Sequence, residues 1–328
     1  MLKTVYGPVP SWRFGRSLGI DLILKPKTCS FNCIYCQLGK TINYVSEPEN
    51  LKNYVKADEV LRDLKICLEK IELKSLDVVT FSGCGEPTLN PELEVVVEDV
   101  KNFLGGKIPT VLLTNSSTLN RENVRKAVSK FDVVCAKLDC SSDQAFKIIN
   151  RPARDVSNIK SIIESVKKLR RELSGKLMIQ SMFLRTAFGF TNYSDEKLRR
   201  LIESIIYIDP DVIQVDTPYR PGGERFVKSL KVDDLREIGR KFRAYFSKDQ
   251  VWVFGVHDKR GKHVKWRNKR NIEENILNLL RRRPCRIVDV ADVLGISYSL
   301  TQKTLEKLAA KNLVEEFKDE EVYFRARI

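Results

Sequence analysis

Short apolar segments recur along most of the 328-residue chain at intervals that leave room for a helix. They are rich in Val, Ile, Leu and Phe with little polar alternation, which is typical of strands buried on both faces of a parallel sheet. The predicted strands are 18–24, 77–82, 109–114, 132–138, 176–184, 211–216 and 251–256, and the predicted helices are 57–72, 91–104, 120–130, 156–173, 194–207 and 232–247. This alternation predicts an α/β barrel or an open parallel sheet.

Polar and glycine-rich residues follow five of the predicted strands. In chain order they are Cys29 to Cys36, Gly83 to Glu86, Asn115, Lys137 with Asp139, and Asp216 to Arg220. Because ligands of parallel α/β folds bind at the carboxyl ends of the strands, we expect these residues to converge on one mouth. Asp216, Tyr219 and Arg220 are candidates to contact the substrate. Arg13 and Arg16 are candidates to pair with an anionic group of it, with surface ion pairs as the alternative.

Three cysteines in the sequence KTCSFNCIYCQ form a C-x3-C-x2-C pattern: Cys29, Cys33 and Cys36. A structural zinc site takes four ligands, often as two C-x2-C pairs, and no histidine is nearby. Three thiolates can instead bind three irons of a [4Fe–4S] cluster and leave the fourth iron open, whereas full clusters usually take four cysteines. A closed site completed by Cys84 is the alternative.

The other cysteines and the bulk composition place the chain in a reducing compartment. Eight cysteines are sparse in 328 residues, so a disulfide scaffold is not expected. We expect Cys67, Cys135 and Cys285 to be small buried side chains, and leave Cys140 open. The first residues lack the apolar run of a signal peptide, and no segment is long and apolar enough for a membrane span. We therefore predict a cytoplasmic protein with no membrane partner.

Positive charge is concentrated in one stretch of the chain. The net charge is +15, and residues 259–283 carry ten Lys and Arg against two Glu. Such a segment favours an anionic partner, with nucleic acid as the first candidate. A solvated linker is the alternative.

The residues beyond 258 predict a second domain. A basic linker (258–270) leads to a helix that begins at Asn271, where Glu274 would complete a capping box. A second helix, a turn at Gly295, a longer helix and two short strands follow. This order predicts a winged helix-turn-helix domain over 271–328, after a core domain over 1–257.

The longer helix of this domain, 297–310, is the one that such modules often place in a DNA major groove. It carries Gln302, Lys303 and Lys307, but also Glu306. Contact with another protein is an equally open role for the module.

The cysteine pattern, with Tyr35 before its last cysteine and Gly85-Glu86-Pro87 after the second strand, resembles the radical S-adenosylmethionine (SAM) superfamily. The resemblance covers roughly residues 5–256 and implies a partial (β/α)6 barrel. It further implies a [4Fe–4S] cluster on Cys29, Cys33 and Cys36 whose open iron is chelated by SAM. An electron from such a cluster cleaves SAM to methionine and a 5′-deoxyadenosyl radical, which abstracts hydrogen from a substrate.

The same resemblance assigns residues to SAM. It implies that the turn at Gly83 and Gly85 receives the methionine amino group, with Glu86 supplying charge or holding the turn. Asn115 would bond the ribose or the carboxylate, and Tyr35 occupies the aromatic position. Of Lys137 and Asp139, we expect Asp139 to face the mouth. The alternative for Glu86 and Asp139 is the capping of a following helix.

Longer segments narrow the resemblance. GPVPSWRFGRSLGIDL, FSGCGEPTLNP, KLDCSSDQAFKIINRP and VDTPYRP are similar to radical SAM proteins grouped with wyosine-type tRNA-modifying enzymes. The chain departs from them at Trp12-Arg13, where Arg-Arg is usual, and at Cys84, where a small residue is usual. The wyosine synthases proper also have cysteine surroundings unlike these. Imidazoline-ring building on tRNA is therefore not carried over, and only the radical chemistry is.

Partners remain open among three classes of substrate. RNA, with tRNA first, is favoured by the basic segment and the predicted winged helix, while a protein or a small metabolite is the alternative. The chemistry implies a reductant such as ferredoxin or flavodoxin. An iron–sulfur or zinc DNA-binding regulator is the alternative of another class, and the oligomeric state is not predicted.

Overall fold

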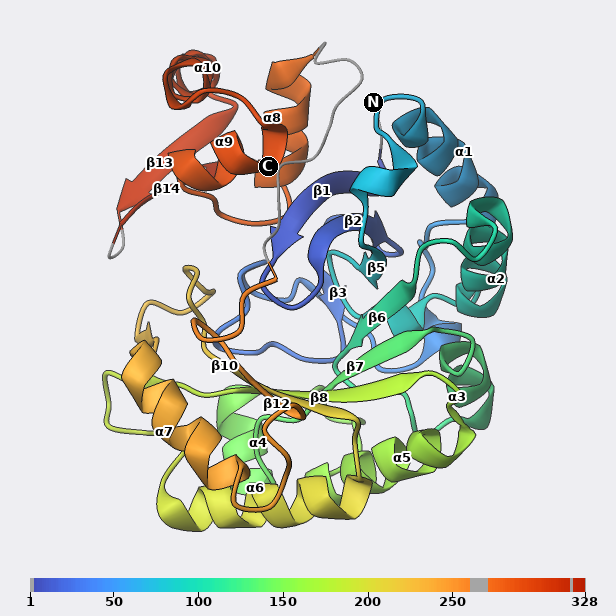
Figure 1. The fold of residues 1–328 in the computed structure, drawn as a ribbon, viewed down its shortest axis with the longest axis vertical. Helices are drawn as coiled ribbons and strands as arrows, with labels where there is room; N and C mark the ends of the chain where they lie inside the picture. The colour runs from blue at the N-terminus through green and yellow to red at the C-terminus, as the bar shows by residue number, and fades with distance from the viewer. Residues whose placement is uncertain (1–2, 260–270, 319–320, 328) are drawn as a thin grey trace.

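An eight-stranded sheet forms the centre of the computed structural model, which describes residues 3–259, 271–318 and 321–327 (Figure 1). The strands follow one another in the order β1-β2-β5-β6-β7-β8-β10-β12. They are β1 (Val5–Ser11), β2 (Gly15–Asp21), β5 (Val78–Ser82), β6 (Thr110–Thr114), β7 (Val133–Lys137), β8 (Lys176–Met182), β10 (Val212–Asp216) and β12 (Val251–Val253). All neighbours from β2 onward are parallel, which confirms the predicted α/β class.

The first strand of the sheet was not predicted. β1 forms an antiparallel hairpin with β2, so the predicted strand 18–24 runs instead from Gly15 to Asp21. Its prolines and glycine hide β1 from a pattern search, because they are rare within strands. β1 and β12 lie at opposite ends of the strand order, so the described sheet is an incomplete barrel.

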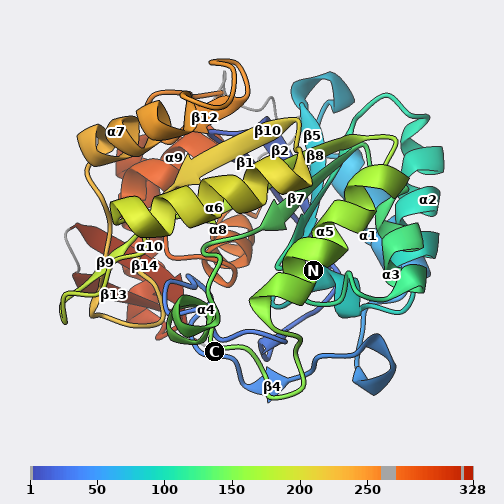
Figure 2. The same cartoon turned by 90° about the horizontal axis from the view of Figure 1, so that it is seen from below.

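Helices cover the outer face of the sheet. They are α1 (Ala57–Leu68), α2 (Leu93–Leu104), α3 (Glu122–Val128), α4 (Asp143–Ile149), α5 (Ile159–Glu172), α6 (Asp195–Ile208) and α7 (Val232–Phe242), and the short α4 was not predicted. Seen from below, α5 and α6 lie across the sheet while α1, α2 and α3 line one side (Figure 2). The six predicted helices are therefore present, most of them shorter than expected.

The two faces of the sheet differ in polarity. Residues facing the helices, such as Leu18 and Ile20 of β2, belong to the main hydrophobic core. The inner face is apolar toward the amino ends of the strands, where Val111, Cys135 and Met178 cluster. Because side chains alternate along a strand, the polar residues that follow on this inner face point into the barrel. This polar end holds the candidate site.

The C-terminal elements gather beside β1 (Figure 1). They are α8 (Ile272–Leu280), α9 (Ile287–Leu294), α10 (Tyr298–Ala310) and the antiparallel strands β13 (Val314–Lys318) and β14 (Val322–Ala326). They enclose a hydrophobic cluster of their own, against which Val9 of β1 packs. We call residues 271–318 with 321–327 the C-terminal unit; its classification as a winged helix and the domain bounds remain predictions.

Two local expectations meet the structure at this junction. The helix begins after Asn271 as predicted, but its side chain makes no cap; the amide donates to the Glu274 carboxylate over 3.2 Å. Most of the predicted basic linker (258–270) lies outside the described residues, which omit 260–270. No helix in the described part of the chain has the length and apolarity that a membrane crossing demands.

Candidate active site

The three cysteines of the motif lie on one loop, which we call the cysteine loop (residues 27–41), after β2. Cys29 ends the short strand β3 (Thr28–Cys29), which pairs with β4 (Asn43–Tyr44), and its side chain is buried. Cys33 and Cys36 are partly exposed, and all three thiols are free. The loop thus presents the motif at the carboxyl end of the sheet.

Gly85 holds the cysteine loop against the turn that follows β5. A Cβ atom built on Gly85 would lie 1.7 Å from the carbonyl oxygen of Thr28, a distance no side chain tolerates. The backbone N–H of Thr28 donates to the carbonyl of Cys84 over 3.0 Å, which fixes the approach. We had expected bare backbone here to admit a ligand; the neighbour that requires glycine at 85 is the cysteine loop itself.

Glu86 is a buried brace within the same turn. Its carboxylate accepts hydrogen bonds from the hydroxyls of Thr88 and Thr114, both over 2.6 Å, and from the backbone N–H of Asn115 over 2.7 Å. Burial raises the pKa of this carboxyl, while these donors act to lower it. Of the two roles predicted, the contacts favour holding the turn. The Glu86 carboxylate also accepts a hydrogen bond from the backbone N–H of Thr88. This bond caps the short 3-10 helix Pro87–Leu89, so the predicted alternative of helix capping is present as well.

Two asparagine amides donate to cysteine sulfurs. Asn115, just after β6, lies 3.5 Å from the sulfur of Cys29 and 2.9 Å from the Ser30 hydroxyl. Asn150, after α4, lies 3.5 Å from the sulfur of Cys33. Asn115 was predicted to bond SAM, whereas Asn150 was not predicted at all. The segment KIINRP that contains it was noted only as a family-like stretch.

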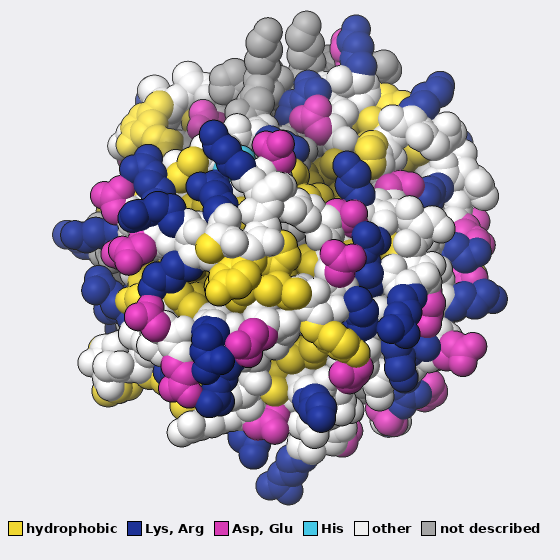
Figure 3. All heavy atoms as spheres, turned by 60° about the horizontal axis from the view of Figure 1, so that its bottom comes forward, with side chains coloured by type: hydrophobic (Ala, Val, Ile, Leu, Met, Phe, Trp, Pro, Cys, Tyr) yellow, Lys and Arg dark blue, Asp and Glu magenta, His cyan; other side chains and the backbone are white. Residues whose placement is uncertain are grey.

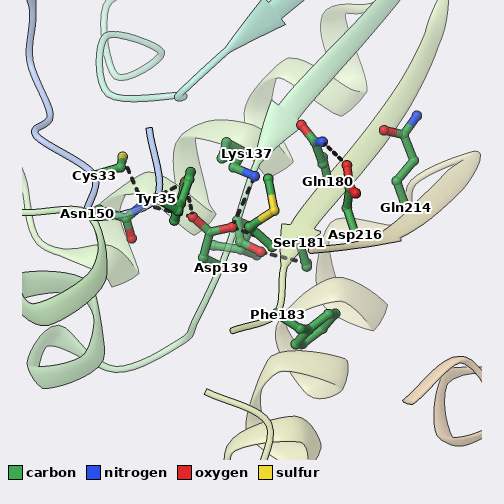
Figure 4. Close-up of polar contacts among 12 residues, drawn as sticks. Cys33, Tyr35, Lys137, Asp139, Asn150, Gln180, Ser181, Phe183, Gln214 and Asp216 are labelled. Carbon is green, nitrogen blue, oxygen red and sulfur yellow. Dashed lines mark hydrogen bonds and ion pairs between the residues drawn. The ribbon is translucent and has the colours of Figure 1, made fainter. Parts of the chain in front are cut away.

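Asp139 is the centre of a buried network that ties the cysteine loop to the sheet (Figure 4). The carboxylate accepts hydrogen bonds from the Tyr35 hydroxyl over 2.5 Å, from the Asn150 amide over 2.8 Å and from the backbone N–H of Met182 over 2.8 Å. Burial and the adjacent carboxylate raise the pKa of Tyr35 well above its ordinary value. The bond between Tyr35 and Asp139 therefore anchors the cysteine loop to the end of β7.

Lys137 joins this network, contrary to expectation. Its ammonium nitrogen lies 3.3 Å from the Asp139 carboxylate and 4.9 Å from the centre of the Tyr35 ring. We expected only Asp139 at the mouth, but residues two apart at a strand end point to the same side. The ammonium is buried and makes no hydrogen bond among the described residues.

The other predicted substrate contacts divide into two groups. Asp216 lies inside the barrel, where it accepts from the Gln180 amide over 2.8 Å (Figure 4). Tyr219 and Arg220 lie apart from it, bonded to each other over 2.8 Å beside the C-terminal unit. Asp216 is therefore the one of the three that the fold places with Lys137 and Asp139 on the inner face.

The two candidate arginines have different surroundings. Arg13 points to the Gln214 amide oxygen over 3.4 Å, and its Nε is buried without a hydrogen-bond partner in the described chain. Arg16 instead forms an ion pair with Asp77, with 2.8 Å between Nη2 and Oδ1, away from the mouth. Arg16 therefore takes the predicted alternative of an ion pair, because the Asp77 carboxylate just before β5 accepts from two of its three guanidinium nitrogens, Nε and Nη2.

The remaining thiols are buried, as expected of Cys67, Cys135 and Cys285. Cys140 is buried too. Burial, aided by the carboxylate of Asp21, raises the pKa of the Cys84 thiol to about 12. A closed site completed by Cys84 stays an alternative prediction.

The donor set of the cysteine loop fits an iron–sulfur cluster better than a single ion. Within residues 3–259, 271–318 and 321–327, no three His, Cys, Asp or Glu side chains are placed to share one metal. A cubane takes each thiolate on a different iron, so cysteines that do not converge on one ion can still bind it. Burial raises the pKa of Cys29 to about 12 and of Cys33 to about 11, so binding must displace protons.

Comparison with known proteins agrees with this arrangement. The domain of the radical SAM superfamily matches residues 23–205, more than half of the chain. The chain therefore belongs to the radical SAM superfamily, and it is an enzyme whose substrate this membership leaves open.

Two curated relatives and one solved structure give the extent of the similarity. A UPF0026 protein of Methanocaldococcus jannaschii is 30% identical over 93% of this chain and 91% of its own. A protein described as GTPase Obg, of Brachyspira hyodysenteriae, is 33% identical over 95% of this chain, which spans 43% of that protein. The crystal structure of Streptococcus suis SuiB shares the fold, with a TM-score of 0.53 and 16% identity over 73% of this chain and 49% of that one.

Proposed function

We propose that this enzyme binds a [4Fe–4S] cluster through Cys29, Cys33 and Cys36 and uses it with SAM for radical chemistry. When bound, the cluster would supply the electron that cleaves SAM to methionine and a 5′-deoxyadenosyl radical, which takes a hydrogen atom from the substrate. A one-electron donor protein such as ferredoxin or flavodoxin would supply that electron. The observation that carries the proposal is the cysteine loop, with three free thiols at the carboxyl end of the sheet.

The chain's own residues prepare this loop for a cluster. Asn115 and Asn150 donate hydrogen bonds to two of the sulfurs, and hydrogen bonds to sulfur are one means by which proteins set a cluster's potential. Lys27 is buried on the same loop, where its ammonium donates to the carbonyl of Gly39 over 2.8 Å. Its positive charge favours the deprotonated form of neighbouring thiols.

For SAM itself, we propose the polar rim next to the loop. The Asn115 amide borders the sulfur of Cys29, and its position suits contact with the methionine end of SAM. Glu86 and Asp139 support this rim through the bonds described above. Lys137 and Asp216, on the inner face, would orient the groups that react.

Anaerobic reconstitution tests the proposal. The protein is loaded with iron and sulfide, reduced with dithionite and mixed with SAM, and the EPR spectrum and the 5′-deoxyadenosine formed are recorded. We expect a [4Fe–4S]⁺ signal that SAM perturbs, and deoxyadenosine that Cys33→Ala abolishes. The matched control is Cys67→Ala, which removes a buried thiol of α1.

Two results contradict the proposal. One is a cluster whose spectrum ignores SAM. The other is zinc bound in place of iron, which would return attention to a closed site. For the substrate we propose RNA, which the charge beside the cysteine loop supports as argued next.

A further inference from the structure

A groove runs between the core and the C-terminal unit, and the end of the cysteine loop forms part of its wall. It consists of two adjoining pockets of about 740 and 680 Å3. They share Pro221, Gly222, Gly223 and Arg325, so they form one continuous hollow. Residues 37–40, directly after Cys36, line the first pocket, and the N–H of Gly39 donates to the Cys36 carbonyl over 3.0 Å.

The lining of this groove is strongly basic. Eleven of its residues are Lys or Arg and two, Glu224 and Glu315, are acidic. Both carboxylates are already paired, Glu224 with Arg151 and Glu315 with Arg325. The excess of positive charge is therefore not neutralised from within.

Five of these basic side chains make no ion pair within the described residues: Lys25, Lys40, Arg225, Lys228 and Lys318. All five are exposed. The stem of Lys25 is nevertheless partly buried, and this burial lowers the pKa of its ammonium. Repulsion from neighbouring arginines such as Arg282 and Arg325 lowers that pKa further. A bound anion would relieve that repulsion.

The face opposite the C-terminal unit in Figure 1 and helix α10 lack this imbalance. In Figure 3, where the bottom of Figure 1 with α5 and α6 comes forward, Lys and Arg side chains are interspersed with Asp and Glu. Helix α10, predicted as a candidate to read DNA, is also balanced. Its Lys307 and the following Lys311 both pair with Glu273, and its Gln302 bonds Glu306. The unbalanced positive charge of the C-terminal unit thus lies on its β13–β14 hairpin and just after α8, where these elements line the groove.

An aromatic side chain lies within the groove. Phe317 of β13 lines the second pocket beside Tyr323, with 6.1 Å between the ring centroids and 25° between their planes. Cationic grooves that carry aromatic side chains bind single-stranded nucleic acids, because phosphates pair with the charges and bases stack on the rings. A folded RNA offers such unpaired bases in its loops and ends.

We infer that this groove binds a single-stranded loop or end of RNA, held between the hairpin of the C-terminal unit and the core beside the cysteine loop. RNA binding in the groove is inferred from the groove itself. That the bound RNA is also the substrate rests on the proposed function. An acidic electron-donor protein is the other occupant the charge would suit. A concave channel of this size fits a strand better than the convex surface of a globular donor.

Binding of a short labelled RNA to the full-length, cluster-loaded protein tests this. The probe is a mixed-sequence single strand of roughly 15 nucleotides, about the largest site of one binding module, followed by fluorescence anisotropy at several salt concentrations. The groove variant combines Lys40→Gln, Arg225→Gln, Lys228→Gln and Lys318→Gln. Its matched control combines Lys107→Gln, Lys147→Gln, Lys160→Gln and Lys168→Gln, four exposed lysines outside the groove.

We expect the groove variant to bind RNA about tenfold or more weakly, with a salt slope smaller by about 3, while the control changes little. Phe317→Leu should weaken binding about fivefold or more through lost stacking, whereas Phe103→Leu, on an exposed ring of α2, should not. Equal RNA affinity in groove variant and wild type overturns the inference. So does tighter binding of the DNA strand of the same sequence.

A second measurement separates this inference from the proposed function. Deoxyadenosine formed with dithionite and no RNA should be unchanged in the groove variant, because its substitutions leave the three cysteines and the inner face intact. Loss of reduction by flavodoxin, with RNA affinity retained, would assign the groove to the electron donor and overturn the inference. Absence of SAM cleavage in the wild type, with groove-dependent RNA binding retained, would sink the proposed function alone.

Discussion

The hydroxyl of Tyr35 donates a 2.5 Å hydrogen bond to the carboxylate of Asp139, and this bond links the cysteine loop to the end of β7. The two residues are separated by 104 positions in the chain. Asn150 donates to the same carboxylate oxygen and to the sulfur of Cys33. The position of Cys33, a proposed cluster ligand, therefore depends on a carboxylate of the barrel interior.

Tyr35→Phe should loosen the cysteine loop without unfolding the protein. Loss of one buried bond to a charged group costs about 1.5–3 kcal/mol of the free energy of unfolding. We expect the reconstituted variant to lose iron to a chelator faster than the wild type does. Tyr44→Phe, on an exposed ring, is the control. Equal rates of iron loss in all three proteins would show that the bond does not support the loop.

Removal of the two partners of the Lys137–Asp139 ion pair should have unequal effects. Asp139→Ala leaves three hydrogen-bond donors and the Lys137 ammonium without their partner and should lower the free energy of unfolding by about 3–5 kcal/mol. Lys137→Met keeps three of the bonds to Asp139 and should cost about 1 kcal/mol. Urea unfolding measures both. Equal costs would contradict a network centred on the carboxylate.

Gly85→Ala should disrupt the loop for reasons of space. Its Cβ would overlap the Thr28 carbonyl, so either the loop or the turn must move. We expect several kcal/mol of destabilisation, on the scale of large core effects, and little iron after reconstitution. Gly39→Ala is the comparison: it has open space but a positive φ of 79°, which costs about 1–2 kcal/mol. Normal iron content in Gly85→Ala would refute the steric argument.

Arg282 of the C-terminal unit forms an ion pair with the buried Asp21 at the end of β2. Arg282→Met should make the stability of the protein depend on the protonation of Asp21. Burial raises the pKa of Asp21, and Arg282 opposes the shift. Without Arg282 the pKa rises further, so the folded variant binds a proton more tightly than the unfolded chain does. Its stability then falls as pH rises from the ordinary carboxyl pKa of about 4 through the raised value.

We therefore expect the penalty of Arg282→Met to be about 3–5 kcal/mol at neutral pH and smaller near pH 5. Urea unfolding at the two pH values measures it. The double variant with Asp21→Asn should recover part of the loss at neutral pH, because no buried charge remains. A penalty independent of pH would mean that Asp21 stays ionised without its partner.

Patterns local in the chain were enough to predict the α/β class and the cysteine motif. The alternation of apolar strands and amphipathic helices depends on residues a few positions apart, which a sequence displays directly. The mostly apolar character of β5, β6 and β10 made them visible, whereas β1 was missed because it contains prolines. The motif at Cys29, Cys33 and Cys36 carried the class of enzyme for the same reason.

The roles of the surrounding residues were decided only by the tertiary structure. Contacts that decide these roles join different elements of the fold: Arg16 with Asp77, Glu86 with Asn115, Tyr35 with Asp139, and Asn150 with Cys33. The groove likewise combines the cysteine loop, the loop after β10 and the C-terminal hairpin. The physical reason is that sheet order and packing bring together residues whose separation along the chain exceeds the range of any local pattern.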